Sequence, residues 1–126
     1  MVESTAAKGA PTESFANDSA KHSMMIQYWG GWGYKSHVTA AIAQIDAELP
    51  DEFNYFIYRD QGRTGRLEFT VYKGVTSLDS DAIEGGVVVH SKENTGKYVK
   101  DNYQGFLEAV KASLQWANRL YERVKD

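Results

Sequence analysis

The sequence predicts a single α/β domain in which two helices cover one small sheet. Apolar residues recur at helical spacing over 36–49 and again over 103–125. Between them, apolar and polar residues alternate over 66–72, the period of a strand with one face on a core and the other in water. A chain of 126 residues is long enough to form one such domain with its own hydrophobic core.

The expected strands are short segments rich in β-branched and aromatic residues, bounded by glycines and polar residues. The first is the apolar run Met24 to Tyr28, which we expect to be buried. Three more strands follow the first helix, at 53–58, 66–72 and 86–90. With the two helices, the predicted order is β-α-β-β-β-α, which places both helices against the sheet.

Each predicted helix has an apolar stripe and a boundary signal. The first helix is expected from Ser36, a plausible N-cap, to Leu49, because Pro50 cannot continue a helix. The second helix is expected from Tyr103 to Lys125, with its charged residues facing outward.

The first 23 residues differ in composition from the rest of the chain. They are rich in Ala, Ser and Thr and show no hydrophobic periodicity, and Phe15 is their one aromatic residue. We therefore expect residues 1–23 to be a flexible, disordered or extended tail and residues 24–126 to be the folded domain. The alternative is a tail that folds onto a partner with Phe15 as its anchor.

Composition excludes several classes of function. The formal net charge of −3 gives no electrostatic reason to expect nucleic-acid binding, and no apolar run is long enough to span a bilayer. The chain has no cysteine, so structural disulfides, thiolate metal sites and catalysis by a protein thiol are excluded. We expect a soluble intracellular protein, in the cytoplasm or in an organelle such as a plastid.

The stretch Trp29-Gly30-Gly31-Trp32 joins the first predicted strand to the first predicted helix. A glycine turn into a helix N-terminus is a common place for chemistry, because the first N–H groups of the helix have no partners within it. In thiol oxidoreductases this position carries Cys-x-x-Cys, and the helix end lowers the pKa of the first thiol. Here tryptophan occupies both cysteine positions, and an indole cannot attack a disulfide or a peroxide.

Four segments of the chain, in order, resemble the selenoprotein W family, also called the Rdx family. Tyr28 to Ser36 is similar to that family's redox loop Tyr-Cys-Gly-x-(Cys or selenocysteine)-Gly-Tyr-Lys. Thr64 to Val71 resembles its Thr-Gly-x-(aromatic)-Glu-Val strand, and Val89 to Lys92 its Ile-His-Ser-Lys. An amphipathic C-terminal helix follows in both. The resemblance implies a compact, two-layer thioredoxin-like fold, but the family's redox activity does not carry over to this loop.

We therefore expect a redox-inactive binding or scaffold module, or a small accessory subunit of a larger complex, and not an enzyme. The expected partner is another protein, with no cofactor and no metal ion. Two glycine-flanked indoles at a loop tip would give a rigid apolar contact with little side-chain entropy to lose. The expected contact residues are Tyr28, Trp29, Gly30, Gly31, Trp32, Tyr34 and Lys35.

Two other functions remain open. One is an oxidoreductase role of the selenoprotein W type that takes its thiol from glutathione or from a partner. The other is a small-molecule or pigment binder that stacks its ligand on the two indoles.

The remaining polar patterns favour no specific site. His22, His37 and His90 are far apart in sequence and have no carboxylate at a metal-ligand spacing. The segment 73–85 contains Asp79-x-Asp81, which is how a calcium-binding loop begins. The rest of the calcium-loop pattern is missing, because Ile83 stands where a third oxygen ligand is needed. We expect this segment to be a solvated loop, with a partner-specific contact as the alternative.

Overall fold

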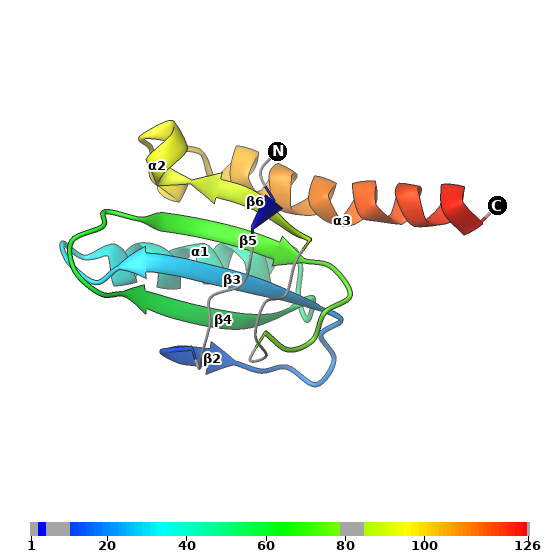
Figure 1. The fold of residues 1–126 in the computed structure, drawn as a ribbon, viewed down its shortest axis with the longest axis horizontal. Coiled ribbons are helices and arrows are strands. Elements are labelled where there is room, and N and C mark those ends of the chain that lie inside the picture. The colour runs from blue at the N-terminus through cyan, green and yellow to red at the C-terminus, as the bar shows by residue number, and fades with distance from the viewer. Residues whose placement is uncertain (1–2, 5–10, 79–84, 126) are drawn as a thin grey trace.

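A computed structural model describes residues 3–4, 11–78 and 85–125, with side chains described for 11–78 and 85–115. Figure 1 shows a mixed α/β domain with one curved sheet. Its strands are β1 (Glu3–Ser4), β2 (Glu13–Phe15), β3 (His22–Trp29), β4 (Phe53–Asp60), β5 (Leu67–Tyr72) and β6 (Gly86–Ser91). Its helices are α1 (Tyr34–Glu48), α2 (Lys92–Thr95), the 3-10 helix η1 (Val99–Asn102) and α3 (Tyr103–Lys125).

The sheet has the strand order β1-β6-β5-β3-β4-β2, so the short strands β1 and β2 form its two edges. Strand β3 lies near the centre, parallel to β4 and antiparallel to β5. The two strands on either side of β3 extend from Phe53 to Asp60 and from Leu67 to Tyr72. These bounds agree to within two residues with the strands predicted at 53–58 and 66–72.

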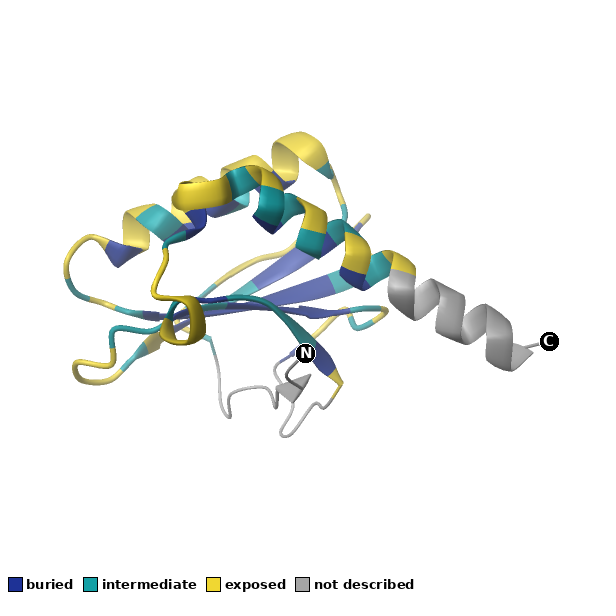
Figure 2. Cartoon of the chain, turned by 90° about the horizontal axis from the view of Figure 1, so that it is seen from above, coloured by how far each residue is buried: buried dark blue, intermediate teal, exposed yellow. Residues whose placement is uncertain are grey.

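Helices α1 and α3 cover the same face of the sheet, as Figure 2 shows. The main core lies between that face and the two helices. It takes alternate residues of β3 (Met24, Ile26 and Tyr28) and the inward stripe of α1, including Val38 and Ile45. Burial of this apolar surface is the main force that holds the two layers together.

The opposite face of the sheet is also covered, which corrects the expectation that one face of the strand at 66–72 lies in water. Met25, Tyr58 and Tyr72 form a second buried cluster there with Leu78, whose side chain is fully buried. Leu78 belongs to the segment predicted to be a solvated loop, so this segment folds back onto the sheet at least as far as residue 78. Asp79, Asp81 and Ile83 lie outside the described residues.

The N-terminal segment is more ordered than expected, because residues 12–15 complete the sheet edge. Strand β2 pairs antiparallel with β4, and the Thr12 N–H donates to the Ile57 carbonyl at 2.8 Å. The Asn17 N–H then donates to the Asn54 side chain at 2.7 Å. Hydrophobic periodicity does not reveal a three-residue edge strand, since backbone pairing holds it in place.

Helix α1 begins earlier than predicted and uses another cap. Gly33, at φ 74°, is its N-cap, so Ser36 lies in the first turn and donates its hydroxyl to the Gly33 carbonyl at 2.6 Å. The polar stretch 91–101, whose composition is typical of a loop, contains α2 and most of η1. No helix in the described part of the chain combines the length and apolar character needed to cross a membrane.

Candidate binding site at the strand–helix loop

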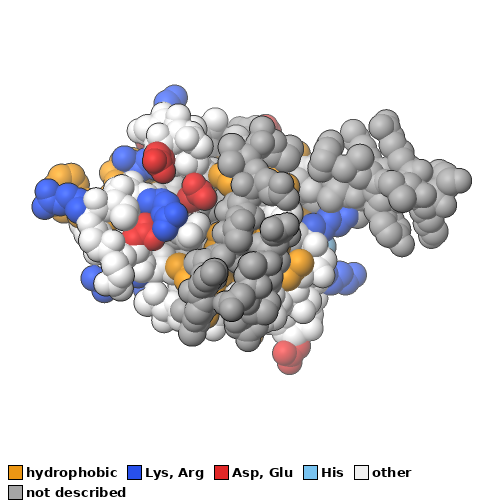
Figure 3. All heavy atoms as spheres, in the orientation of Figure 1, with side chains coloured by type: hydrophobic (Ala, Val, Ile, Leu, Met, Phe, Trp, Pro, Cys, Tyr) orange, Lys and Arg blue, Asp and Glu red, His pale blue; other side chains and the backbone are white. Residues whose placement is uncertain are grey.

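The loop between β3 and α1 presents one tryptophan to solvent and holds the other against the protein. The Trp29 N–H donates to the Arg66 carbonyl at 2.8 Å, and the ring of Trp29 packs against the main core. Trp32 is 81% exposed, the most exposed large hydrophobic side chain of the described residues. Figure 3 shows exposed hydrophobic side chains beside Lys and Arg at the end of the molecule where this loop lies.

The backbone at Trp32 has a conformation that bulky residues rarely adopt. Trp32 has φ 51° and is followed by Gly33 at φ 74°, so two consecutive residues adopt the left-handed conformation. Glycine adopts this conformation readily, whereas a bulky side chain is rarely found there. Trp32 therefore sits in an unfavourable backbone conformation although its own side chain buries little surface.

The two glycines before Trp32 lie close to neighbouring side chains. A Cβ atom on Gly31 would lie 2.5 Å from the Trp29 ring, and one on Gly30 would lie 2.1 Å from Nε of Arg59. Real Cβ atoms essentially never come so close to other heavy atoms. Glycine at position 31 lets the Trp29 ring lie directly over the loop backbone, whereas a side chain at position 30 would displace the flexible end of Arg59.

A row of aromatic contacts connects the exposed indole to the core. The ring centroids of Trp32 and Trp29 are 5.2 Å apart in an edge-to-face arrangement, and those of Trp29 and Tyr34 are 5.4 Å apart. Tyr34 in turn contacts Tyr98 edge-to-face at 5.6 Å. Such pairs are favourable beyond the area they bury. We call these four rings the aromatic row.

Cations flank the inner end of the aromatic row. The ammonium groups of Lys92 and Lys100 lie 5.1 and 5.9 Å from the centre of the Tyr98 ring. His37 stacks on the same ring at 4.3 Å, and burial and then Lys100 lower the pKa of His37. Hydrogen bonding with Tyr34 and burial raise the pKa of Tyr98. The raised pKa keeps the Tyr98 hydroxyl uncharged near neutral pH, with the Lys92 and Lys100 side chains beside its ring.

Three of the predicted contact residues do not lie at the exposed tip. Tyr28 and Tyr34 are each only 3% exposed, since both side chains belong to the main core. Lys35 points away from the tip and forms an ion pair with Glu13 of β2. Two donors at the start of α1 are also occupied, because the Tyr34 and Ser36 N–H groups bond to the carbonyls of Gly31 and Gly33.

The sequence interpretation missed Tyr98 and its neighbours, because residues 91–101 look like a polar loop. The one available signal is that Tyr98 is an aromatic residue among polar ones. Among the side chains that the structure describes, no three acidic or histidine groups gather to hold a metal ion.

Comparisons with protein-family models, with curated proteins and with solved structures find no match for this chain. The loop thus holds an exposed indole, in a strained backbone conformation, against the partly buried ring of Trp29 and the buried ring of Tyr34.

Proposed function

We propose that this chain is a redox-inactive domain of the selenoprotein W type that binds another protein through the tip of its β3–α1 loop. The observation that carries the proposal is Trp32, which is 81% exposed and has φ 51°. A residue that is both strained and exposed contributes little to folding, and such strain is concentrated at functional sites.

The strand arrangement supports a thioredoxin-like fold. In the order β6-β5-β3-β4, the first long strand is parallel to the strand after α1 and antiparallel to β5. The loop that resembles the family's redox motif follows that first long strand directly. Trp29 and Trp32 occupy the two positions that carry sulfur or selenium in the motif.

The size of the exposed ring favours a protein contact. Covering about 200 Å² of indole removes enough apolar surface to contribute about 5 kcal/mol before the costs of association. Tryptophan is enriched among the residues that dominate binding energy in protein interfaces. The other rings of the aromatic row, Trp29 first, restrict how Trp32 can move. Less conformational entropy is therefore lost when a partner covers the Trp32 side chain.

Affinity capture with matched variants tests the proposal. The bait proteins are the wild type, Trp32→Ala and Phe15→Ala, each with the same C-terminal tag, in extracts of the source cells. Phe15 is a suitable control because it is, among the side chains that the structure describes, the other large hydrophobic one that is well exposed, at 50%, and it lies in a different part of the fold. A partner held by the wild type and by Phe15→Ala, but lost with Trp32→Ala, supports the proposal. Equal capture by all three proteins contradicts it.

An activity assay separates this proposal from an oxidoreductase role. The purified protein is incubated with glutathione and a disulfide or peroxide substrate, and we expect turnover equal to that in buffer alone. Turnover that the wild type supports and Trp32→Ala abolishes would show that the loop acts in catalysis.

A further inference from the structure

A second concave site lies between helix α1 and strand β4, away from the β3–α1 loop. Helix α1 packs over β3, whereas the sheet continues beyond it to β4 and the added edge strand β2. The sheet face beside α1 borders a cavity of about 440 Å³. Sites for small organic ligands have volumes in this range.

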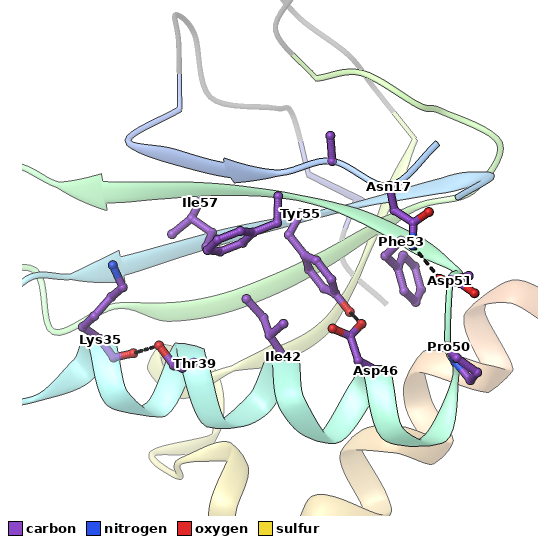
Figure 4. A pocket seen from close by; sticks show the side chains of 12 residues that line it. Asn17, Lys35, Thr39, Ile42, Asp46, Pro50, Asp51, Phe53, Tyr55 and Ile57 are labelled. Carbon is purple, nitrogen blue, oxygen red and sulfur yellow. Dashed lines mark hydrogen bonds between the residues drawn. The ribbon is translucent and has the colours of Figure 1, made fainter. Parts of the chain in front are cut away.

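The walls of this cavity are largely apolar, as Figure 4 shows. Phe53, Tyr55 and Ile57 project from one face of β4, and the half-buried Ile42 faces them from α1. Phe15 of β2 lines the outer side and is 50% exposed. Because Phe53, Tyr55 and Ile57 are each at most 3% exposed, an aromatic or aliphatic ligand body would mainly cover the surface of Phe15 and Ile42 that the fold leaves in contact with water.

The charges around the cavity are unequal at its two ends. At one end Lys35 is neutralised by its ion pair with Glu13. At the other end Asp46 accepts a hydrogen bond from the Tyr55 hydroxyl at 2.8 Å, which leaves its second carboxylate oxygen for another donor. Asp51 lines the same end and accepts from the Asn17 side chain at 2.7 Å. An apolar cavity with uncompensated negative charge at one end complements a cation on an apolar body.

We propose that this cavity binds a small aromatic or aliphatic molecule that carries a protonated amine, with the ammonium group on Asp46 and the body against Tyr55 and Ile42. This site is separate from the Trp32 tip and does not depend on the proposed function there.

Nuclear magnetic resonance titration of the full chain tests the site with three related probes: tryptamine, the neutral 3-methylindole and the anionic indole-3-propionate. We expect saturable shifts of backbone amides within 39–46 and 53–57, with tryptamine binding at least about fivefold more tightly than the anion. Absence of saturable shifts with tryptamine would overturn the site. The site would also be overturned if indole-3-propionate bound as tightly as tryptamine or more tightly, or if the shifts were confined to the 29–32 loop.

Variants then test the roles of individual side chains. Asp46→Asn keeps an acceptor for Tyr55 but removes the charge, and we expect it to weaken tryptamine binding about two- to fivefold, the effect of a partly exposed ion pair. Glu48→Gln removes the same charge from α1 outside the cavity and should leave binding unchanged. Thr39→Phe fills the cavity from α1 and should weaken all binding by more than about tenfold. If the Asp46→Asn and Glu48→Gln variants bind tryptamine equally well, or if the Thr39→Phe variant binds it as tightly as the wild type, the proposal is wrong. If a variant fails to fold, the comparison of the three probes on the wild type decides.

Discussion

Replacement of Trp32 should have little effect on stability, although tryptophan is the largest side chain. Because it is 81% exposed, only about a fifth of its surface, about 50 Å², is covered by the rest of the protein. At about 25 cal/mol per Å² this contact contributes about 1.2 kcal/mol. We therefore expect Trp32→Ala to lower the free energy of unfolding by about 1 kcal/mol.

A second substitution at the same position isolates the backbone conformation. Alanine at position 32 retains the cost of the left-handed conformation, whereas asparagine adopts that conformation more easily. The expected free energy of unfolding is therefore about 0.5–1 kcal/mol higher for Trp32→Asn than for Trp32→Ala. Trp29→Ala serves as the contrasting variant, because its ring packs on the core and over Gly31, and we expect it to cost about 3 kcal/mol.

Urea denaturation followed by far-ultraviolet circular dichroism measures these differences without depending on tryptophan fluorescence, which each substitution changes by removing one of the three tryptophans. A loss above about 2.5 kcal/mol for Trp32→Ala would refute the reasoning, because the exposed ring would then be stabilising the fold as a core residue does. Equal stability of the alanine and asparagine variants would show that the backbone at position 32 is not strained.

Three further predictions concern other parts of the fold. Gly31→Ala should cost about 1–3 kcal/mol and change the near-ultraviolet circular dichroism of Trp29, because the new Cβ would lie 2.5 Å from that ring. Leu78→Ala should cost about 2–5 kcal/mol in urea denaturation, because this fully buried side chain closes the second face of the sheet. Burial lowers the pKa of His90 below 6.5, so the folded state favours its neutral ring and stability falls as the pH drops below 6.5. His90→Gln should therefore reduce the loss of urea midpoint between about pH 7.5 and pH 5.

Each of these predictions has a contradicting outcome. A Gly31→Ala variant with wild-type stability would mean that the Trp29 ring can leave the loop at no cost. A Leu78→Ala loss below about 1 kcal/mol would place that side chain outside the core. If His90→Gln has the same pH dependence as the wild type, other groups account for the loss of stability in acid.

The long elements of the fold were predictable from the sequence because their signals are repeated within each element. Helix α3 has the predicted bounds, Tyr103–Lys125, since its apolar stripe continues over many turns. The strand at 66–72 was also found, but its second face was predicted to be solvated. Its alternation gives the period of a strand, yet it cannot show that Leu78 returns from a later segment to cover that face.

The position of the β3–α1 loop was predictable, but the orientation of its side chains was not. The glycines of the loop mark a turn before a helix, and the structure has that turn between β3 and α1. Whether a ring at its border turns inward depends on packing with distant segments, so Tyr28 and Tyr34 were placed wrongly on the exposed patch. Tyr98 was missed for the same reason, since its contact with Tyr34 joins residues 64 positions apart.

The positions of β1 and β2 have a consequence for any shortened form of the chain. Both strands come from the first 15 residues, yet they occupy opposite edges of the sheet. Loss of this segment would uncover the backbone donors and acceptors of β6 and β4 together. With two different open edges, the β6 edge of one molecule could pair with the β4 edge of the next, and head-to-tail pairing would give an open-ended polymer. With a single open edge, association would end at a dimer. The N-terminal residues would thus prevent polymerisation by covering both edges of the sheet.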